Sequence, residues 1–205
     1  MKAILLAAGR GTRISRMVEE VPKCTLPING KPLIRITAEL LLKADIDITV
    51  CVGYKSTMVC KALEGLDVHF YHNPFFDVTN SIASLWFAKE ALVGDVLILN
   101  ADVFFSEVIL NRILSDSRDV TMAIDTGRTI TGDYFFSTTD SGCIRKYGKD
   151  LPLTERSCEY VGIAKVTTQF MPIMLDRLEA LIQNQKHQMW WEDVLYSLSK
   201  EKNIF

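Results

Sequence analysis

Short apolar runs alternate with helix-like patterns over residues 1–125 of the chain. Apolar residues recur at helical spacing in 33–44, and Pro32 before them suits the start of a helix. Residues 95–101 form a nearly continuous apolar run, which is typical of a strand buried on both faces. The whole pattern predicts strands at 3–7, 46–53, 68–72, 95–101 and 120–125, and helices at 33–44, 57–63, 80–92 and 106–114.

This regular alternation predicts an α/β fold with a doubly wound, mainly parallel sheet. In such a sheet the ligand lies at the carboxyl ends of the strands. After residue 126 turn residues become frequent, and the pattern predicts strands at 134–138, 143–147 and 158–166 and helices at 171–184 and 192–198. No linker-like composition separates the two parts. We therefore expect one domain, residues 1–205, in which a smaller lobe of residues 126–205 is appended to the same sheet.

Charge and cysteine content exclude several functions. The chain carries 23 Lys and Arg against 25 Asp and Glu, a net charge of −2, so binding of nucleic acid through bulk positive charge is not expected. No apolar run approaches the roughly 20 residues of a membrane span, and the first residues do not form a signal peptide. The five cysteines have neither disulfide nor metal-ligand spacing, which predicts reduced thiols and a cytoplasmic protein.

A glycine-rich segment, LAAGRGTR at residues 6–13, follows the first predicted strand directly. Its small residues let the backbone approach a ligand, and successive N–H groups can hold phosphate oxygens. A dinucleotide fingerprint needs Gly or Ala at position 14, where Ile14 stands. A Walker loop needs Ser or Thr after Gly30-Lys31, where Pro32 stands. Both of these motifs are excluded, and for the glycines alone a structural turn stays an alternative.

The order of motifs around this loop carries a resemblance. Within residues 5–34 the chain reads LAAGRGTRISRMVEEVPKCTLPINGKPLI, with the pair Pro22-Lys23 and the run Gly-Lys-Pro-Leu-Ile. This resembles the nucleotidyltransferase superfamily that makes sugar- and choline-type nucleotides. The stretches 80–92 and 97–105 are similar to those of bacterial phosphocholine cytidylyltransferases. The similarity weakens over 126–156 and returns at 159–166 and 190–195.

The resemblance implies a glycosyltransferase-A-like, Rossmann-like fold and a magnesium-dependent reaction. A phosphorylated acceptor attacks the α-phosphorus of a nucleoside triphosphate, here expected to be CTP, and pyrophosphate leaves. Residues 1–125 would bind the nucleotide, and residues 126–205 would bind a small phosphorylated amino alcohol or a phosphonate analogue. A sugar-1-phosphate nucleotidyltransferase is the first alternative. A nucleotide-binding regulatory module without full catalysis is the second. A homodimer is compatible with the sequence, which does not determine the oligomeric state.

Three charged residues are the expected catalytic groups. The attacking phosphate is already an anion, so the catalyst must bring anions together and stabilise the charge on the leaving group. Arg13 suits the β- and γ-phosphates, and Lys23 suits the α-phosphate or the acceptor phosphate. Asp102 follows the apolar run 95–101, where its carboxylate would bind Mg²⁺.

Members of the superfamily usually place a second metal-binding carboxylate in an acidic segment near the carboxyl terminus. This chain reaches Phe205 before any such segment. Three alternatives stay open. The segment is missing from this chain, Asp193 or Glu192 takes its place, or the protein is a weak catalyst.

The resemblance also implies two sets of binding residues. The Trp190-Trp191-Glu192-Asp193 run offers aromatic faces and carboxylates to a quaternary ammonium, unless these tryptophans are core anchors. Glu159 and Gly162 instead match a pattern that contacts sugar hydroxyls in sugar-phosphate relatives, so the acceptor stays open. The expected nucleotide-binding residues are Leu6, Ala7, Ala8, Gly9, Gly11, Thr12, Tyr54, Asn73 and Ser84, and the expected acceptor-binding residues are Glu159, Trp190, Trp191 and Glu192.

Overall fold

A computed structural model describes residues 1–10 and 21–205 of the chain. One large sheet runs through the described part, and a two-stranded hairpin of β2 (Pro27–Ile28) and β3 (Lys31–Pro32) lies apart from it. The strands of the large sheet are β1 (Lys2–Ala7), β4 (Asp47–Val52), β5 (Val68–His72), β6 (Val96–Asn100), β7 (Val120–Asp125), β8 (Phe135–Thr138), β9 (Ile144–Gly148) and β10 (Cys158–Val166).

The parallel part of the sheet is built around β1. This strand pairs in parallel with β4 on one side and β6 on the other, and β4 pairs in parallel with β5. Ala3, Ile4 and Leu5 are fully buried, because both faces of this part are covered. The strands predicted at 3–7, 46–53, 68–72 and 95–101 are confirmed.

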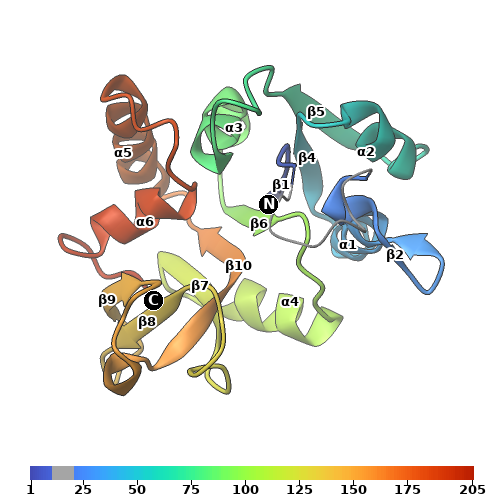
Figure 1. Ribbon diagram of the computed structural model, residues 1–205. Coiled ribbons are helices and arrows are strands. Elements are labelled where there is room, and N and C mark those ends of the chain that lie inside the picture. Colours follow the sequence, from blue (N-terminus) through green and yellow to red (C-terminus); the bar gives the residue numbers. More distant parts are fainter. Residues whose placement is uncertain (11–20) are drawn as a thin grey trace.

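Helices cover both faces of the sheet. Helices α1, α2 and α4 lie on one face of the sheet, and α3, α5 and α6 lie on the opposite face (Figure 1). The side chains of each group pack in a separate hydrophobic core. This is the predicted doubly wound α/β fold. No helix in the described part of the chain is both long and apolar enough to cross a membrane. The helices are α1 (Leu33–Lys43), α2 (Ser56–Ala62), α3 (Ser81–Phe87), α4 (Glu107–Ser115), α5 (Met171–Gln183) and α6 (Glu192–Leu198).

Short 3-10 turns account for the difference from the predicted helices. The helix predicted at 80–92 is α3 followed by the separate turn η3 (Lys89–Ala91). Asn80 caps α3, since its side chain accepts a hydrogen bond of 2.8 Å from the Ser81 N–H. Two further turns, η2 (Lys23–Thr25) and η4 (Leu153–Glu155), lie in connections.

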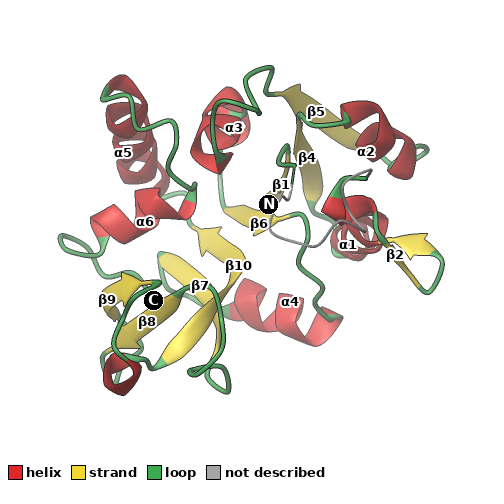
Figure 2. Ribbon diagram, viewed as in Figure 1, coloured by secondary structure: helices red, strands yellow, loops and turns green. Residues whose placement is uncertain are grey.

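The second part of the chain contributes a strand to the inside of the sheet. β10 lies between β6 and β7 and runs antiparallel to both. The strand predicted at 120–125 is confirmed and points the same way as β6, although β10 separates the two strands. Figure 2 shows β7, β8 and β9 gathered at the end of the sheet away from β5. Residues from both parts of the chain share this sheet. That residues 1–125 bind the nucleotide and residues 126–205 bind the acceptor stays a prediction.

A glycine lets β10 lie close to the end of β6. The register of β10 on β7 shifts between Tyr160 and Ala164, and Gly162 lies in this bulge with a φ of +85°. A Cβ at this position would lie 2.8 Å from Val103 Cγ2 and 3.0 Å from Asn100 Nδ2. Both the backbone conformation and the space therefore require glycine.

We expect Gly162→Ala to lower the free energy of unfolding by about 2–4 kcal/mol, because it combines backbone strain with overpacking. The matched control is Gly65→Ala. Gly65 has a φ of +82° but nothing within 4 Å of its Cβ position. That control should lose only about 1 kcal/mol from strain. Urea unfolding measures the free energy of unfolding of both variants. Equal losses would show that close contact with the end of β6 does not add to the cost of Gly162→Ala.

Candidate active site

A cleft of about 1320 Å³ opens at the carboxyl ends of the central parallel strands. β1 and β6 end at Ala7 and Asn100, and the residues that follow them line the cleft. The rest of its lining comes from the turn η2, the loop before α3 and the start of α3, the turn before β8, the residue after β9, the bulge of β10, and α6 with the segment before it. The position agrees with the expectation for a ligand on a doubly wound sheet.

Most of the predicted site residues lie along this cleft. Gly11, Thr12 and Arg13 fall outside the described residues. Tyr54, Asn73 and Trp191 do not line the cleft. Direct contact with a nucleotide, an acceptor or a metal stays a prediction for those that do, which are Leu6, Ala7, Ala8, Gly9, Ser84, Lys23, Asp102, Glu159, Trp190 and Glu192.

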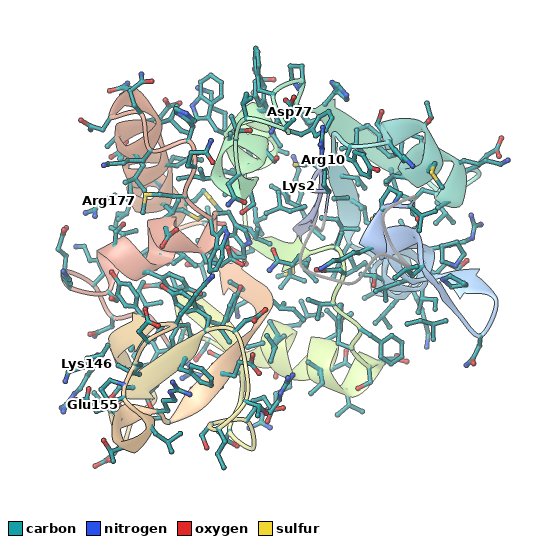
Figure 3. The ribbon with its side chains drawn as sticks, viewed as in Figure 1. Lys2, Arg10, Asp77, Lys146, Glu155 and Arg177 are labelled. Atoms are coloured by element: carbon teal, nitrogen blue, oxygen red, sulfur yellow. The ribbon has the colours of Figure 1, made fainter. Side chains whose placement is uncertain are left out.

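The backbone after β1 forms the side expected for the nucleotide. The N–H of Tyr54 donates a hydrogen bond of 3.0 Å to the Ala8 carbonyl, which fixes the loop from outside the cleft. The Arg10 guanidinium lies 5.6 Å from the Tyr54 ring centroid and 5.8 Å from that of Phe76. Arg10 lines the cleft and is labelled in Figure 3. Sequence analysis did not select this cation, although it lies inside the glycine-rich segment.

Asn73 supports the cleft but does not contact it. Its side chain is 1% exposed, and its Nδ2 donates hydrogen bonds of 3.1 Å to Thr79 Oγ1 and 3.0 Å to Ser84 Oγ. Its Oδ1 accepts a hydrogen bond of 2.9 Å from the Phe75 N–H. Since the protein uses these polar atoms, the prediction that Asn73 binds the nucleotide is wrong. Asn73 instead positions Ser84, which does line the cleft.

Lys23 and Asp102 line the cleft as predicted. Lys23 begins the turn η2, and Asp102 is exposed just beyond the end of β6. Cys24, which follows Lys23, also lines the cleft, and the pKa of its thiol is raised to about 12 by burial and by the charge of Asp102. This thiol keeps its proton at neutral pH and is a poor nucleophile. A thiol nucleophile is therefore not expected in this part of the cleft.

The tryptophan pair has two different roles. Trp191 is fully buried, and its Nε1 donates a hydrogen bond of 2.9 Å to Asn100 Oδ1. The prediction that Trp191 forms an aromatic wall for the acceptor is wrong, because its ring is a core anchor. Trp190 does line the cleft, and its ring meets that of Tyr134 edge-on with 5.6 Å between centroids.

Asn100 connects the end of β6 to the start of α6. Besides accepting from Trp191, it donates a hydrogen bond of 2.8 Å from Nδ2 to Glu192 Oε1. Burial, together with the smaller effects of the charges of Asp193 and Asp102, raises the pKa of the Glu192 carboxyl to about 7, against the hydrogen bond from Asn100. Glu192 therefore titrates near neutral pH while it lines the cleft.

The carboxylate of Glu159 already binds protein groups. Its Oε1 accepts a hydrogen bond of 2.7 Å from the Asp133 N–H. Arg128 Nε lies 3.0 Å from its Oε2, as an ion pair and not as an aligned hydrogen bond. A Cβ at Gly132 would lie 2.5 Å from this carboxylate, so the turn before β8 is fitted around it. The carboxylate of Glu159 is thus an integral part of the turn before β8, and within the described residues its Oε2 accepts no hydrogen bond.

Hydrogen bonds join the segment before α6 to the start of α3. The N–H of Asn80 donates 2.9 Å to the His187 carbonyl, and the N–H of Trp191 donates 2.9 Å to Ser81 Oγ. Asn80 and Ser81 line the cleft, and so does Trp190. The hydrogen bonds thus join two separate segments of the cleft wall directly. Sequence analysis also did not select Asn100, Tyr134, Lys149, Tyr160 and Tyr196, which line the cleft.

Comparison with known proteins agrees with the fold and the cleft. A phosphoglutamine cytidylyltransferase from Campylobacter jejuni is 24% identical over 223 residues, which cover 100% of this chain and 85% of that protein. A choline-phosphate cytidylyltransferase from Streptococcus pneumoniae is 36% identical over 112 residues. That match covers 54% of this chain and about half, 49%, of the relative.

A solved structure has the same fold. The phosphocholine cytidylyltransferase structure from Streptococcus pneumoniae superposes with a TM-score of 0.82 at 23% identity, over 100% of this chain and 87% of that one. The fold and the sequence matches together identify a nucleotidyltransferase. More particularly, the chain belongs to the family of MobA-like NTP transferase domains, whose model matches residues 3–196. The superfamily expected from the glycine-rich loop and the motifs after it is confirmed.

The buried Glu192 predicts a pH dependence of stability. Its pKa is about 7 in the folded protein against an ordinary 4.5, so the folded state holds this proton more tightly than the unfolded chain. The stability that it contributes is complete below pH 4.5 and is lost as the pH rises through about 7.

We therefore expect the free energy of unfolding of the wild type to fall between pH 5 and pH 8.5, and we expect Glu192→Gln to remove this fall. That fall is on the order of 3 kcal/mol, from the size of the pKa difference. Urea unfolding at several pH values without added metal measures it. Glu64→Gln changes an exposed carboxylate and should keep the wild-type pH dependence. Parallel curves for wild type and Glu192→Gln would contradict the effect.

Proposed function

We propose that this chain transfers a cytidylyl group from CTP to a small phosphorylated compound that carries an amine, such as phosphocholine or 2-aminoethylphosphonate. The observation that carries the proposal is the composition of one continuous cleft. It is lined by the backbone after β1, Lys23 and Asp102, and also by Trp190, Tyr134 and Glu192. The first group suits a triphosphate, and the second suits an organic cation. The cytidylyltransferases among its relatives support this choice.

The reaction needs charge and position more than proton transfer. An oxygen of the acceptor phosphate forms a bond to the α-phosphorus as the bond to the pyrophosphate oxygen breaks. The acceptor oxygen is already anionic, so no base is required. The backbone N–H groups after β1 would hold phosphate oxygens, and Lys23 would lie against the α-phosphate or the acceptor phosphate. Arg13, outside the described residues, would bind the β- and γ-phosphates.

Magnesium suits the donors of this cleft. Asp102 is an exposed carboxylate, and Glu192 is a second acid whose pKa is raised in part by the charge of Asp102. Such a concentration of acidic groups beside phosphates favours a divalent cation. Among residues 1–10 and 21–205, no three His, Cys, Asp or Glu gather as a metal site. Asp102 would therefore hold Mg²⁺ together with phosphate oxygens, and the metal would neutralise charge on the phosphates.

The cytoplasm is the compartment that we propose for this reaction. All five cysteines lie within the described residues and are free thiols. Reduced thiols are typical of the cytoplasm.

Nucleotide and acceptor binding can be tested in turn. A thermal-shift screen with Mg²⁺ and CTP, UTP, ATP or GTP should show the largest stabilisation with CTP. Pyrophosphate release is then measured with phosphocholine, phosphoethanolamine, 2-aminoethylphosphonate and glucose-1-phosphate. Turnover with an amine-bearing acceptor supports the proposal. A preference for glucose-1-phosphate would favour a sugar nucleotidyltransferase, and nucleotide binding without any turnover would favour a regulatory module.

Asp102→Asn should abolish magnesium-dependent pyrophosphate release, because it removes the anionic ligand proposed for the metal. The melting temperature should change little, since Asp102 is exposed. Asp176→Asn makes the same chemical change on the exposed side of α5 and should keep full activity. Near-normal turnover of Asp102→Asn at saturating Mg²⁺ would remove Asp102 from the proposed metal site.

Lys23→Ala should lower turnover by about 10²- to 10³-fold, the scale for losing one preorganised group that stabilises charge. Arg13→Ala should show a loss of similar size for the same reason. Lys31→Ala is the control. Lys31 is exposed and does not line the cleft, and its ammonium nitrogen lies 2.7 Å from Glu39 Oε2. Initial rates at saturating CTP provide the measurement, and wild-type kinetics in Lys23→Ala would exclude the role given to Lys23.

A further inference from the structure

The aromatic face of Trp190 already carries a cation from the protein itself. The ammonium nitrogen of Lys149 lies 4.3 Å from the centroid of the Trp190 ring. This is the geometry of a cation–π contact. Lys149 follows β9 directly, whereas Trp190 lies just before α6, so the contact joins two distant segments of the chain.

The same residues lie at an extension of the main cleft. Tyr134, Lys149 and Trp190 line the cleft, and together with Asp193 they also line an adjoining cavity of about 420 Å³. We call these four residues the Lys149 pocket. Lys23 and the described residues that follow β1 do not line this smaller cavity. Its position is that of a subsite for the part of the acceptor remote from the phosphate.

The aromatic part of the Lys149 pocket is fixed, whereas the lysine is not. The Trp190 N–H donates a hydrogen bond of 2.9 Å to Asp193 Oδ2, and the Tyr134 ring meets Trp190 edge-on. Tyr134 is in turn stacked on Tyr196, with 4.9 Å between centroids. Lys149 is exposed and reaches the ring through a flexible stem. The pocket is thus a preformed cation site whose occupant is a mobile side chain.

An acceptor with a quaternary ammonium conflicts with this arrangement. Such a group has no N–H and depends on an aromatic face for binding. It must either displace the Lys149 ammonium from Trp190 or lie beside a like charge. A primary ammonium has another choice, because it can donate charge-assisted hydrogen bonds to the carboxylates of Glu192 and Asp193. It therefore binds without the face that Lys149 covers.

We propose that Lys149 is a specificity-determining residue, which fills the aromatic cation site with its own ammonium and makes the cleft select a phosphorylated primary amine over a phosphorylated quaternary ammonium. The proposal rests on the proposed function, since it assumes that the acceptor's amine reaches the Lys149 pocket.

The test compares two acceptors in the wild type and in Lys149→Met, which keeps a flexible apolar stem and removes the charge. Phosphoethanolamine and phosphocholine are titrated by calorimetry into protein that holds Mg²⁺ and a non-hydrolysable CTP analogue. In the wild type phosphoethanolamine should bind more tightly. In Lys149→Met the ratio of the two dissociation constants should move about tenfold toward phosphocholine, the size of one cation–π contact. Both acceptors carry a phosphate, so the ratio of their dissociation constants cancels any general effect that the lost lysine charge has on phosphate binding.

Three variants serve as controls. Lys149→Arg keeps a cation for the Trp190 face and should keep the wild-type ratio. Lys146→Met makes the same change three residues earlier, where Lys146 pairs with Glu155 at 2.6 Å (Figure 3), and should also keep it. Adding Trp190→Leu to Lys149→Met should remove the gain for phosphocholine, because the aromatic face is then absent.

Two results would overturn the role of Lys149. One is tighter binding of phosphocholine than of phosphoethanolamine by the wild type. The other is an unchanged ratio in Lys149→Met. Failure of the proposed function looks different, since the CTP analogue or both amines would then fail to bind the wild type. Binding of the analogue and of an amine, with no effect of Lys149, leaves the proposed function standing and removes only this inference.

Discussion

The two hydrogen bonds of the Asn100 side chain hold the cleft together. One of them satisfies the buried indole N–H of Trp191, and the other holds the carboxyl of Glu192. Leaving such buried groups without partners costs about 1–3 kcal/mol each, so the end of β6 and the start of α6 are fixed to one another. The position of Trp190, one residue before the anchor, follows from this connection. So does the closeness of Glu192 to the part of the cleft that Asp102 lines.

The parts of the cleft expected for the nucleotide and for the acceptor are built in different ways. The nucleotide part includes the small residues Ala7, Ala8 and Gly9, whose backbone follows a parallel strand that is buried on both faces. The acceptor side consists of side chains from segments far apart in the sequence, such as Tyr134, Lys149 and Trp190. Backbone groups suit a ligand part that all nucleotides share. Side chains can differ from one protein to the next, which suits the choice of acceptor.

The sequence allowed most of the first part of the fold to be predicted, because its signals are local. The apolar run at 95–101 and the loop after β1 each depend on a few neighbouring residues. The role of Trp191 could not be predicted in the same way. Trp190 and Trp191 are adjacent and chemically identical, and only the direction of each ring separates a core anchor from a cleft residue. The contact of Lys149 with Trp190 joins two loops, and no spacing in the sequence indicates such a pair.

The place of β10 in the sheet has a consequence for how the chain is made. β6 ends at Asn100, but the strand that covers its free edge begins only at Cys158. During synthesis the apolar strand β6 is therefore exposed along one side while the intervening residues are still being added. Unpaired strand edges of this kind are sites of aggregation, and pairings between distant segments form slowly. The last third of the chain thus acts as a late cover for an edge that the first half cannot protect alone.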